Sequence, residues 1–222
     1  MRRVVMLAVA LPLMLWVLTQ CRKPRGVLGR TFAWGMNRSH SAMTDWALRD
    51  VPVRPSDAIL DIGCGGGRTV HKLATRASEG TVFGVDYAEA SVAMSRRTNA
   101  EAIASGRVRI EHGSVAALPF TERTFDLVTA VETHYYWPDL PACFCEIGRV
   151  LKPGGRFVLV AETYRGARFN VLYAVVMRLL RAAHLTPEEH QNLFAQAGFT
   201  DVTTTHAPNT NWICVTGRKA EP

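Results

Sequence analysis

A glycine-rich turn between an apolar run and an amphipathic segment constrains this chain most strongly. Residues 58–62 read AILDI, Gly63, Gly65 and Gly67 follow, and a helix-like segment begins at Arg68. Glycine has no Cβ and adopts positive φ, so the backbone of such a turn can approach a ligand closely. The helix N-terminus beyond it offers unpaired N–H groups to a polar or anionic group. The stretch predicts the first β-α unit of a ligand-binding domain.

Strand-like and helix-like segments alternate after this turn. Strands are predicted at residues 58–61, 81–85, 108–111, 125–131, 156–161, 201–206 and 211–217, and helices at 68–77, 89–105, 140–150 and from Thr186 to Gly198. Such alternation predicts right-handed crossovers and a doubly wound, mostly parallel α/β sheet. The last two strands are close enough in sequence to pair as a hairpin. Ligands of such sheets bind beyond the carboxyl ends of the strands.

The turn does not match the dinucleotide-binding pattern G-x-G-x-x-G. Its third glycine position holds Arg68, and Asp61 would place a negative charge beside a pyrophosphate. Asp86 ends the second predicted strand, 23 positions after Gly63, where a carboxylate can accept both hydroxyls of a ribose. These residues indicate a nucleoside with a positively charged tail.

Four ordered motifs carry a family resemblance. They are residues 61–67 (DIGCGGG), 85–87 (VDY), 125–128 (FDLV) and 151–155 (LKPGG). The region from about 35 to 217 resembles the class I S-adenosylmethionine-dependent methyltransferases, and most closely their type 11 small-molecule branch. The resemblance implies a seven-stranded, Rossmann-like sheet with an antiparallel C-terminal hairpin and S-adenosyl-L-methionine as cofactor.

The resemblance also assigns the cofactor residues. Asp61 and the backbone of Gly63, Cys64 and Gly65 would hold the methionyl end, Asp86 the ribose and Tyr87 the adenine. Many members carry an acidic residue after the third strand, whereas this chain reads His112-Gly113-Ser114-Val115. Ser114 and Val115 are therefore expected to meet the adenine, mainly through backbone groups. Glu132, after the fourth strand, completes the expected set.

The loop at residues 132–139 (ETHYYWPD) is expected beside the reactive methyl group. Tyr135, Tyr136 and Trp137 are candidate wall residues, because aromatic faces stabilise a cation within about 6 Å. His134 is a candidate general base, since its ordinary pKa of about 6.5 suits the role. Its alternative role is only to shape the pocket. Glu162, after the fifth strand, is a second candidate base.

The N-terminal segment, residues 1–25, combines an apolar run with basic flanks. A helix from Val4 to Gln20 would be about 26 Å long, just short of a bilayer core of about 30 Å. A signal peptide and a lipoprotein signal at Cys21 both lack the small residues that cleavage needs. An upstream extension is a third alternative. An uncleaved anchor at residues 4–20 is favoured, and the basic residues after it predict a cytoplasmic catalytic domain on the inner face of a membrane.

Two further segments flank the predicted site. Residues 26–55 form a predicted N-terminal helical lid, with Asn37 and His40 facing the substrate; simple packing of this helix on the sheet is the alternative. Residues 56–222 form the methyltransferase domain, with a helical insertion at about 164–185 that is basic and amphipathic. That insertion could be a core helix, a substrate lid or a membrane-facing cap.

Charge and cysteine usage limit the other functions. The net charge of +7 is not gathered into long Lys/Arg blocks, and the Asn/Asp-Pro-Pro-Tyr signature of nitrogen methylation is absent. No DNA partner is expected and RNA is disfavoured. Five cysteines without metal-ligand spacing predict no metal site. The predicted function is methyl transfer to a small acceptor, which the anchor suggests is lipophilic. The alternatives are methylation of RNA or protein, and a non-catalytic S-adenosylmethionine-binding membrane protein.

Overall fold

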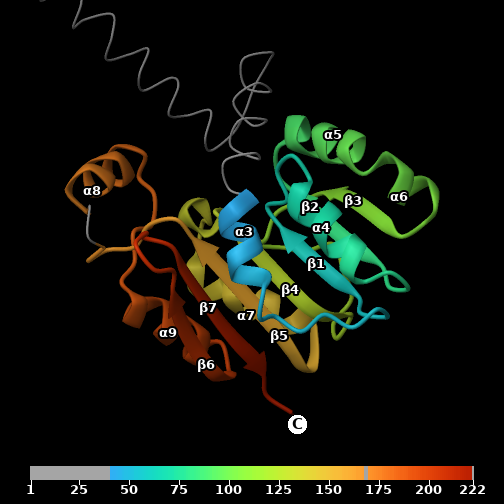
Figure 1. The fold of residues 1–222 in the computed structure, drawn as a ribbon. Helices are drawn as coiled ribbons and strands as arrows, with labels where there is room; N and C mark the ends of the chain where they lie inside the picture. The colour runs from blue at the N-terminus through green and yellow to red at the C-terminus, as the bar shows by residue number, and fades with distance from the viewer. Residues whose placement is uncertain (1–40, 168–169, 222) are drawn as a thin grey trace, which may run out of the picture.

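The fold is a single seven-stranded sheet covered by helices on both faces (Figure 1). A computed structural model describes residues 41–167 and 170–221. The strand order is β3-β2-β1-β4-β5-β7-β6. The strands are β1 (Ile59–Ile62), β2 (Val82–Asp86), β3 (Val108–His112), β4 (Phe125–Val131), β5 (Leu151–Ala161), β6 (Phe199–His206) and β7 (Ile213–Lys219). The first five run parallel, and β7 pairs antiparallel with both β5 and β6. The predicted doubly wound sheet with a C-terminal hairpin is confirmed.

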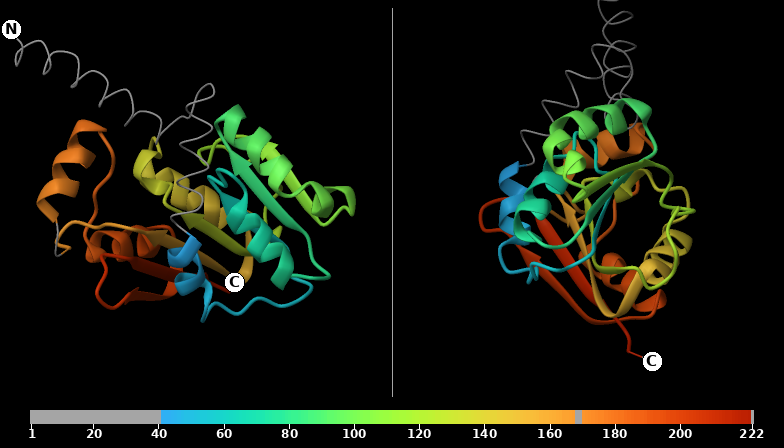
Figure 2. Two further views of the ribbon diagram at one scale, coloured as in Figure 1. Left: turned by 45° about the horizontal axis from the view of Figure 1, so that its top comes forward. Right: turned by 90° about the vertical axis from the view of Figure 1, so that its right-hand side faces the viewer.

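The helices divide between the two faces of the sheet. They are α3 (Ser41–Leu48), α4 (Arg68–Arg76), α5 (Glu89–Thr98), α6 (Ala100–Ala104), the 3₁₀ helix η1 (His134–Tyr136), α7 (Leu140–Val150), α8 (Asn170–Leu179) and α9 (Pro187–Gln196). Met43 of α3 and Leu73 of α4 pack in one core layer with Ile59. Phe144 of α7 and Phe194 of α9 pack in the other with Leu60. The right-hand view of Figure 2 shows α3 on one side of the sheet and α7 and α9 on the other. Successive residues of β1 thus serve opposite layers, as the two-residue period of a strand requires.

Three elements differ from the sequence prediction. The helix predicted at 89–105 is divided at Asn99, whose side-chain amide donates to the carbonyls of Gly67 and Ser95. β5 begins at Leu151, five residues earlier than predicted, and the pairing register shifts between Phe125 and Leu127 of the neighbouring strand. The insertion is helical only over Asn170–Leu179 within the described residues, and Arg181 has a left-handed backbone, with φ 50°, beyond that helix.

Several predictions lie outside the described residues. They include the anchor at residues 4–20 and the lid residues Asn37 and His40. No helix within residues 41–167 or 170–221 combines the length and apolar character that a bilayer crossing requires. The described part of the predicted lid is α3, whose Met43 and Leu48 are buried against the sheet.

Candidate active site

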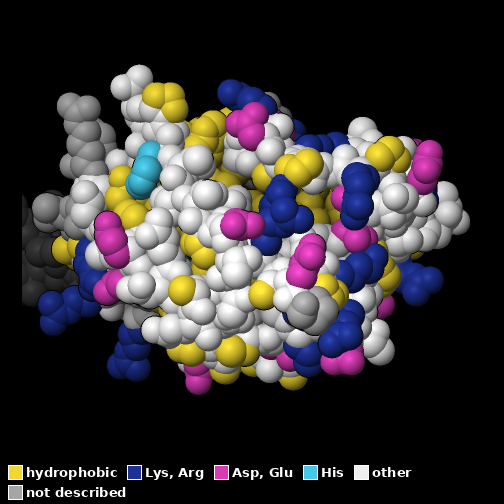
Figure 3. Space-filling model, turned by 90° about the horizontal axis from the view of Figure 1, so that it is seen from below, with side chains coloured by type: hydrophobic (Ala, Val, Ile, Leu, Met, Phe, Trp, Pro, Cys, Tyr) yellow, Lys and Arg dark blue, Asp and Glu magenta, His cyan; other side chains and the backbone are white. Residues whose placement is uncertain are grey.

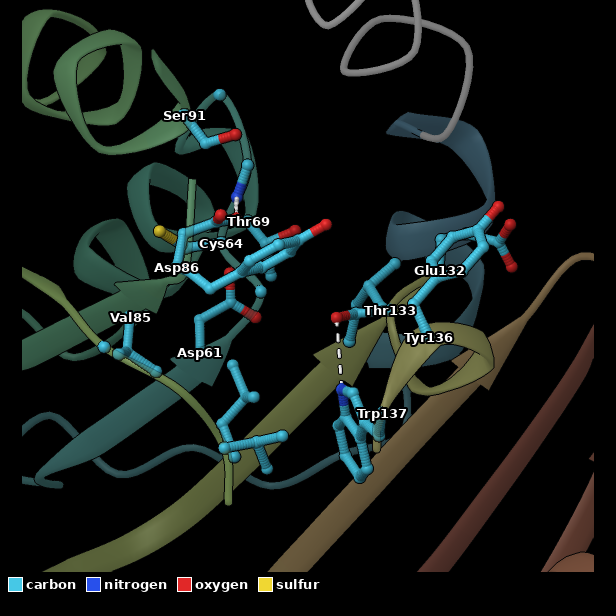
Figure 4. A pocket seen from close by; sticks show the side chains of 18 of the residues that line it. Asp61, Cys64, Thr69, Val85, Asp86, Ser91, Glu132, Thr133, Tyr136 and Trp137 are labelled. Carbon is cyan, nitrogen blue, oxygen red and sulfur yellow. Dashed lines mark hydrogen bonds between the residues drawn. The ribbon is translucent and has the colours of Figure 1, made fainter. Parts of the chain in front are cut away.

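A cavity of about 400 Å³ lies at the carboxyl ends of β1, β2 and β4. Its walls come from the glycine-rich turn, the start of α3, the start of α5 and the loops after β2, β3 and β4. Figure 4 shows Asp61 and Asp86 on one side, with Thr133, Tyr136 and Trp137 across from them. The parallel strands bring these loops together because all their carboxyl ends meet at one edge of the sheet.

Backbone hydrogen bonds to the neighbouring strand β2 fix the conformation of the glycine-rich turn. Gly63 and Cys64 both donate their N–H groups to the carbonyl of Val85, at 2.7 and 3.1 Å. Gly63, Gly65 and Gly67 have φ of 67°, 52° and 81°, in the left-handed region that other residues avoid. A Cβ on Gly65 would meet only the Gly63 carbonyl, at 3.9 Å, so the turn leaves free space toward the cavity.

Asp86 fastens the turn to β2. One carboxylate oxygen accepts the Gly65 N–H at 2.9 Å, and the other accepts the Ala88 N–H at 2.8 Å. A carboxylate has about four acceptor positions, so two remain for a ligand. Burial raises the pKa of Asp86, and the two backbone N–H groups oppose that rise.

Asp61 is the more deeply buried of the two carboxylates. Burial raises its pKa to about 7, with a further contribution from the charge of Asp86. The Thr129 hydroxyl donates to it at 2.7 Å and opposes the rise. Removing a carboxylate from water disfavours its charged form, and a nearby cation restores it. The pair therefore suits a positively charged ligand.

The other predicted cofactor residues reach the cavity in different ways. The Cys64 side chain turns away toward Ser95, with Sγ 3.7 Å from the hydroxyl, so only its backbone can hold a ligand. Tyr87 stands 39% exposed at the cavity. Ser114 and Val115 line it beside Gly113, and the Ser114 hydroxyl accepts the Ala116 N–H.

Two of the predicted aromatic wall residues line the cavity. Tyr136 and Trp137 do so, and the indole N–H of Trp137 donates to the Thr133 hydroxyl at 3.4 Å. Tyr135 does not: it is buried, and its hydroxyl donates to Glu132 and Thr163. Burial and the Glu132 charge raise the Tyr135 pKa. The prediction of Tyr135 as a wall residue is corrected accordingly.

The structure does not bring His134 to the cavity. Its ring is buried between Tyr135 and His190, with the two histidine Nε2 atoms 3.2 Å apart. His190 Nδ1–H donates to the Thr186 carbonyl, so its Nε2 accepts from His134 and the Nδ1 of His134 carries no proton. Burial lowers the pKa of both rings. His134 is therefore not placed to act as the predicted general base. With His190 it forms a buried pair that joins η1 to α9.

Glu162 also lies outside the cavity wall. Its backbone N–H donates to the Glu132 carboxylate, which accepts the Tyr135 hydroxyl at 2.9 Å as well. Glu132 itself lines the cavity, with a left-handed backbone at φ 59°. Its carboxylate thus ties the end of β5 to η1, at the edge of the cavity that Glu132 lines.

Several lining residues were not singled out from sequence. They are Ser41, Thr44, Thr69, Ser91 and Thr133. Thr69 and Thr133 adjoin motifs and their position could have suggested them. Ser41 and Thr44 lie on α3, well before the first motif, and Ser91 lies on α5, four residues after Tyr87. No local signal distinguishes these three from ordinary helix residues.

A row of basic residues on α4 fastens α3 beside the cavity. Arg68 donates to the Ser41 hydroxyl, and Lys72 donates to the hydroxyl and carbonyl of Ser41. Arg76 donates to the carbonyls of Leu48, the last residue of α3, and of Val51 after it. The spacing i, i+4, i+8 puts these three cations on one helix face. Arg68, the residue that breaks the dinucleotide pattern, therefore positions α3.

Charged side chains of both signs are mixed on one face of the protein. On the face shown in Figure 3, basic and acidic side chains are interspersed. Within the described ranges, no three His, Cys, Asp or Glu side chains come together as a metal-binding group.

Comparison with known proteins finds methyltransferases that match part of this chain. A methyltransferase domain family matches residues 59–155. The demethylmenaquinone methyltransferase of Symbiobacterium thermophilum is 38% identical over 117 residues, covering 52% of this chain and 47% of that protein. The 27-O-demethylrifamycin SV methyltransferase of Amycolatopsis mediterranei is 31% identical over 140 residues, covering 57% of this chain and 51% of that protein. The chain thus spans about half the length of these curated relatives.

Solved structures share the fold over most of the chain. Geranyl diphosphate C-methyltransferase from Streptomyces coelicolor, with S-adenosyl-L-homocysteine bound, has a TM-score of 0.71 and 17% identity, and the match covers 89% of this chain and 86% of that one. The matched domain runs from β1 into β5 and contains the glycine-rich turn, Asp61, Asp86 and the loop after β4. The region from β1 into β5 is thus similar to methyltransferase domains, as the four sequence motifs predict.

Proposed function

We propose that this protein transfers a methyl group from S-adenosyl-L-methionine to a small, lipophilic acceptor. The observation that carries the proposal is the division of the cavity, with two buried carboxylates on one side and Thr133, Tyr136 and Trp137 on the other. Curated relatives are named for demethylmenaquinone, 27-O-demethylrifamycin SV and cycloartenol, which supports a small-molecule acceptor.

The residues present fit the cofactor. The cavity volume of about 400 Å³ lies within the range of small-molecule sites, roughly 300–1,000 Å³. The free acceptor positions of Asp86 would take the ribose hydroxyls, and Asp61 with the backbone of 63–65 would hold the methionyl end. Tyr87 would cover the adenine, whose edge would meet the backbone of Ser114 and Val115.

The bound cofactor supplies an electrophilic methyl group on a sulfonium centre. The chain's contribution is to align an acceptor with that methyl group and to exclude water. Tyr136 and Trp137 form the wall that orders the acceptor, and an aromatic face contributes about 0.5–2 kcal/mol toward a nearby cation. Neither His134 nor Glu162 lines the cavity. Alignment, which is worth up to about 7–11 kcal/mol in favourable cases, therefore replaces a histidine base in this proposal.

The acceptor class is tested by following the methyl group. The purified protein is incubated with methyl-tritiated cofactor and separate lipid, small-molecule, RNA and protein fractions of a cell extract. Label is expected in the lipid or small-molecule fraction. Label confined to RNA or protein would favour the alternative substrates instead. If no fraction is labelled and no S-adenosylhomocysteine forms, the protein is a cofactor-binding protein without turnover.

Cofactor affinity is expected to fall as pH drops through about 7. The raised pKa of Asp61, about 7, means that the carboxyl is protonated below that value in the free protein, so a cationic ligand loses its partner. The dissociation constant is expected to rise by up to about tenfold per pH unit below 7. Calorimetry between pH 5.5 and 8.5 measures it. Asp61→Asn should bind weakly at every pH with a flattened profile; an unchanged profile would exclude Asp61 as the titrating group.

We also propose that residues 4–20 anchor the protein to a membrane, with the catalytic domain on the cytoplasmic side. The support is the apolar run between basic flanks in the sequence. Washing membranes that contain the full chain with alkaline carbonate should leave it in the pellet. Release into the supernatant would contradict the anchor.

A further inference from the structure

Helix α8 presents apolar side chains to solvent. Val175 is 52% exposed and Leu179 is 49% exposed, and their spacing of four residues puts them on one face. Met177, on the other side of the helix, is buried in the core layer of α7 and α9. This packing fixes which face of α8 points outward. Figures 1 and 2 both show α8 standing away from the sheet.

The insertion around α8 has a single sign of charge. No acidic residue occurs between Glu162 and Glu188, whereas four arginines do, at positions 165, 168, 178 and 181. Arg165 pairs with Glu189 of α9. Arg178 and Arg181 are exposed, and Arg178 lies between the two exposed apolar residues in sequence. An apolar face flanked by arginines complements a surface that is both apolar and anionic.

The insertion is joined directly to the acceptor side of the cavity. The Ala183 N–H donates to the Tyr135 carbonyl at 2.8 Å, just before Tyr136 and Trp137. The Ala182 N–H donates to the Met177 carbonyl at 2.9 Å, which closes the end of α8. A surface that holds α8 would therefore lie close to the wall that receives the acceptor.

We propose that α8 lies on the surface of a bilayer containing anionic lipids, with Val175 and Leu179 in the headgroup region and Arg178 and Arg181 at lipid phosphates. Helices with this distribution of side chains bind in the plane of the interface, and basic residues near them favour anionic lipids. The proposal rests on the proposed function, because a bilayer is the source of a lipophilic acceptor. It gives the protein a second proposed membrane contact besides the anchor proposed at residues 4–20.

Hydrogen–deuterium exchange of the full chain tests this contact without any turnover. The protein is mixed with vesicles of phosphatidylcholine alone or with phosphatidylglycerol added, and exchange is measured by mass spectrometry. Peptides spanning 170–181 are expected to exchange about fivefold or more slowly only with the anionic vesicles. Peptides of β4 and α7 serve as the internal reference, since their exchange should not change.

Double variants test which side chains cause the slowed exchange over residues 170–181. Arg178→Glu with Arg181→Glu, or Val175→Ser with Leu179→Ser, should abolish the slowing over 170–181. Arg49→Glu with Arg97→Glu makes the same charge change at exposed positions elsewhere and should leave it intact.

Three results would overturn the proposal. The first is unchanged exchange of α8 while residues 4–20 become protected by the same vesicles. The second is equal slowing by phosphatidylcholine alone, which would remove the role of the arginines. The third is protection of α8 without vesicles, which would show that another part of the chain or a second copy covers it. A protein without methyl transfer but with the expected exchange pattern would refute the proposed function and leave the membrane contact standing.

Discussion

Asp86→Ala is expected to weaken S-adenosyl-L-methionine binding by about 10²- to 10⁴-fold. A hydrogen bond to a charged group is worth about 1.5–3 kcal/mol, and the proposed contact has two, one to each ribose hydroxyl. The substitution also removes the acceptor of the Gly65 N–H, so the turn loses its fastening to β2. Calorimetric titration of the purified variant with the cofactor measures the loss.

The matched control is Glu111→Ala. Glu111 is an exposed carboxylate on β3, the strand next to β2. The Glu111→Ala variant should therefore bind the cofactor as tightly as the parent protein does. Asp86→Asn separates charge from shape: the amide keeps the size of the side chain but loses the charge and half of the acceptor capacity, so it should fall between parent and Asp86→Ala. A parent-like affinity for Asp86→Ala, with folding verified by circular dichroism, would remove Asp86 from the cofactor site.

Gly67→Ala is expected to destabilise the fold by about 2–5 kcal/mol. Its φ of 81° costs an alanine about 1–2 kcal/mol, and overpacking adds about 1–3 kcal/mol. A Cβ there would lie 2.5 Å from the Asn99 amide nitrogen and 2.8 Å from the Ser95 Cα, so α5 would have to move away from α4. Urea unfolding followed by circular dichroism measures the change.

Gly106→Ala is the control variant without steric crowding. Gly106 has a similar φ of 77°, but a Cβ there meets nothing within 4 Å. It should therefore cost only the conformational part, about 1–2 kcal/mol. The difference between the two variants measures how closely the glycine-rich turn packs on α5. Equal urea midpoints for the two variants would show that α5 can shift to accommodate the added Cβ without loss of stability.

The motif residues were predictable because each motif is a local pattern. The three glycines and the carboxylates Asp61 and Asp86 stand at or just after the carboxyl ends of predicted strands. Parallel strands bring these ends together at one edge of the sheet, where the cavity lies. The strand set was predicted for the same reason, since buried strands read as short apolar runs between turns.

The four consecutive residues from His134 to Trp137 show where local reasoning stops. The sequence makes all four candidates for the cavity wall, but η1 is a 3₁₀ helix with three residues per turn, so neighbouring side chains point in different directions. Tyr136 and Trp137 therefore face the cavity, whereas His134 and Tyr135 face α9 and the end of β5. The partner of His134 is His190, 56 positions later, and no local pattern predicts that contact.

By itself the sequence predicted the sheet, because strand and helix periods and glycine placement are local patterns. Its four motifs carried the resemblance to methyltransferases that implies S-adenosyl-L-methionine as cofactor. Only the tertiary structure decided which side chains line the acceptor side, that Arg68 donates to Ser41 of α3, and that α8 exposes its apolar face. Those features depend on contacts between segments far apart in the chain. Such contacts fix side-chain direction and burial, which sequence spacing leaves undetermined.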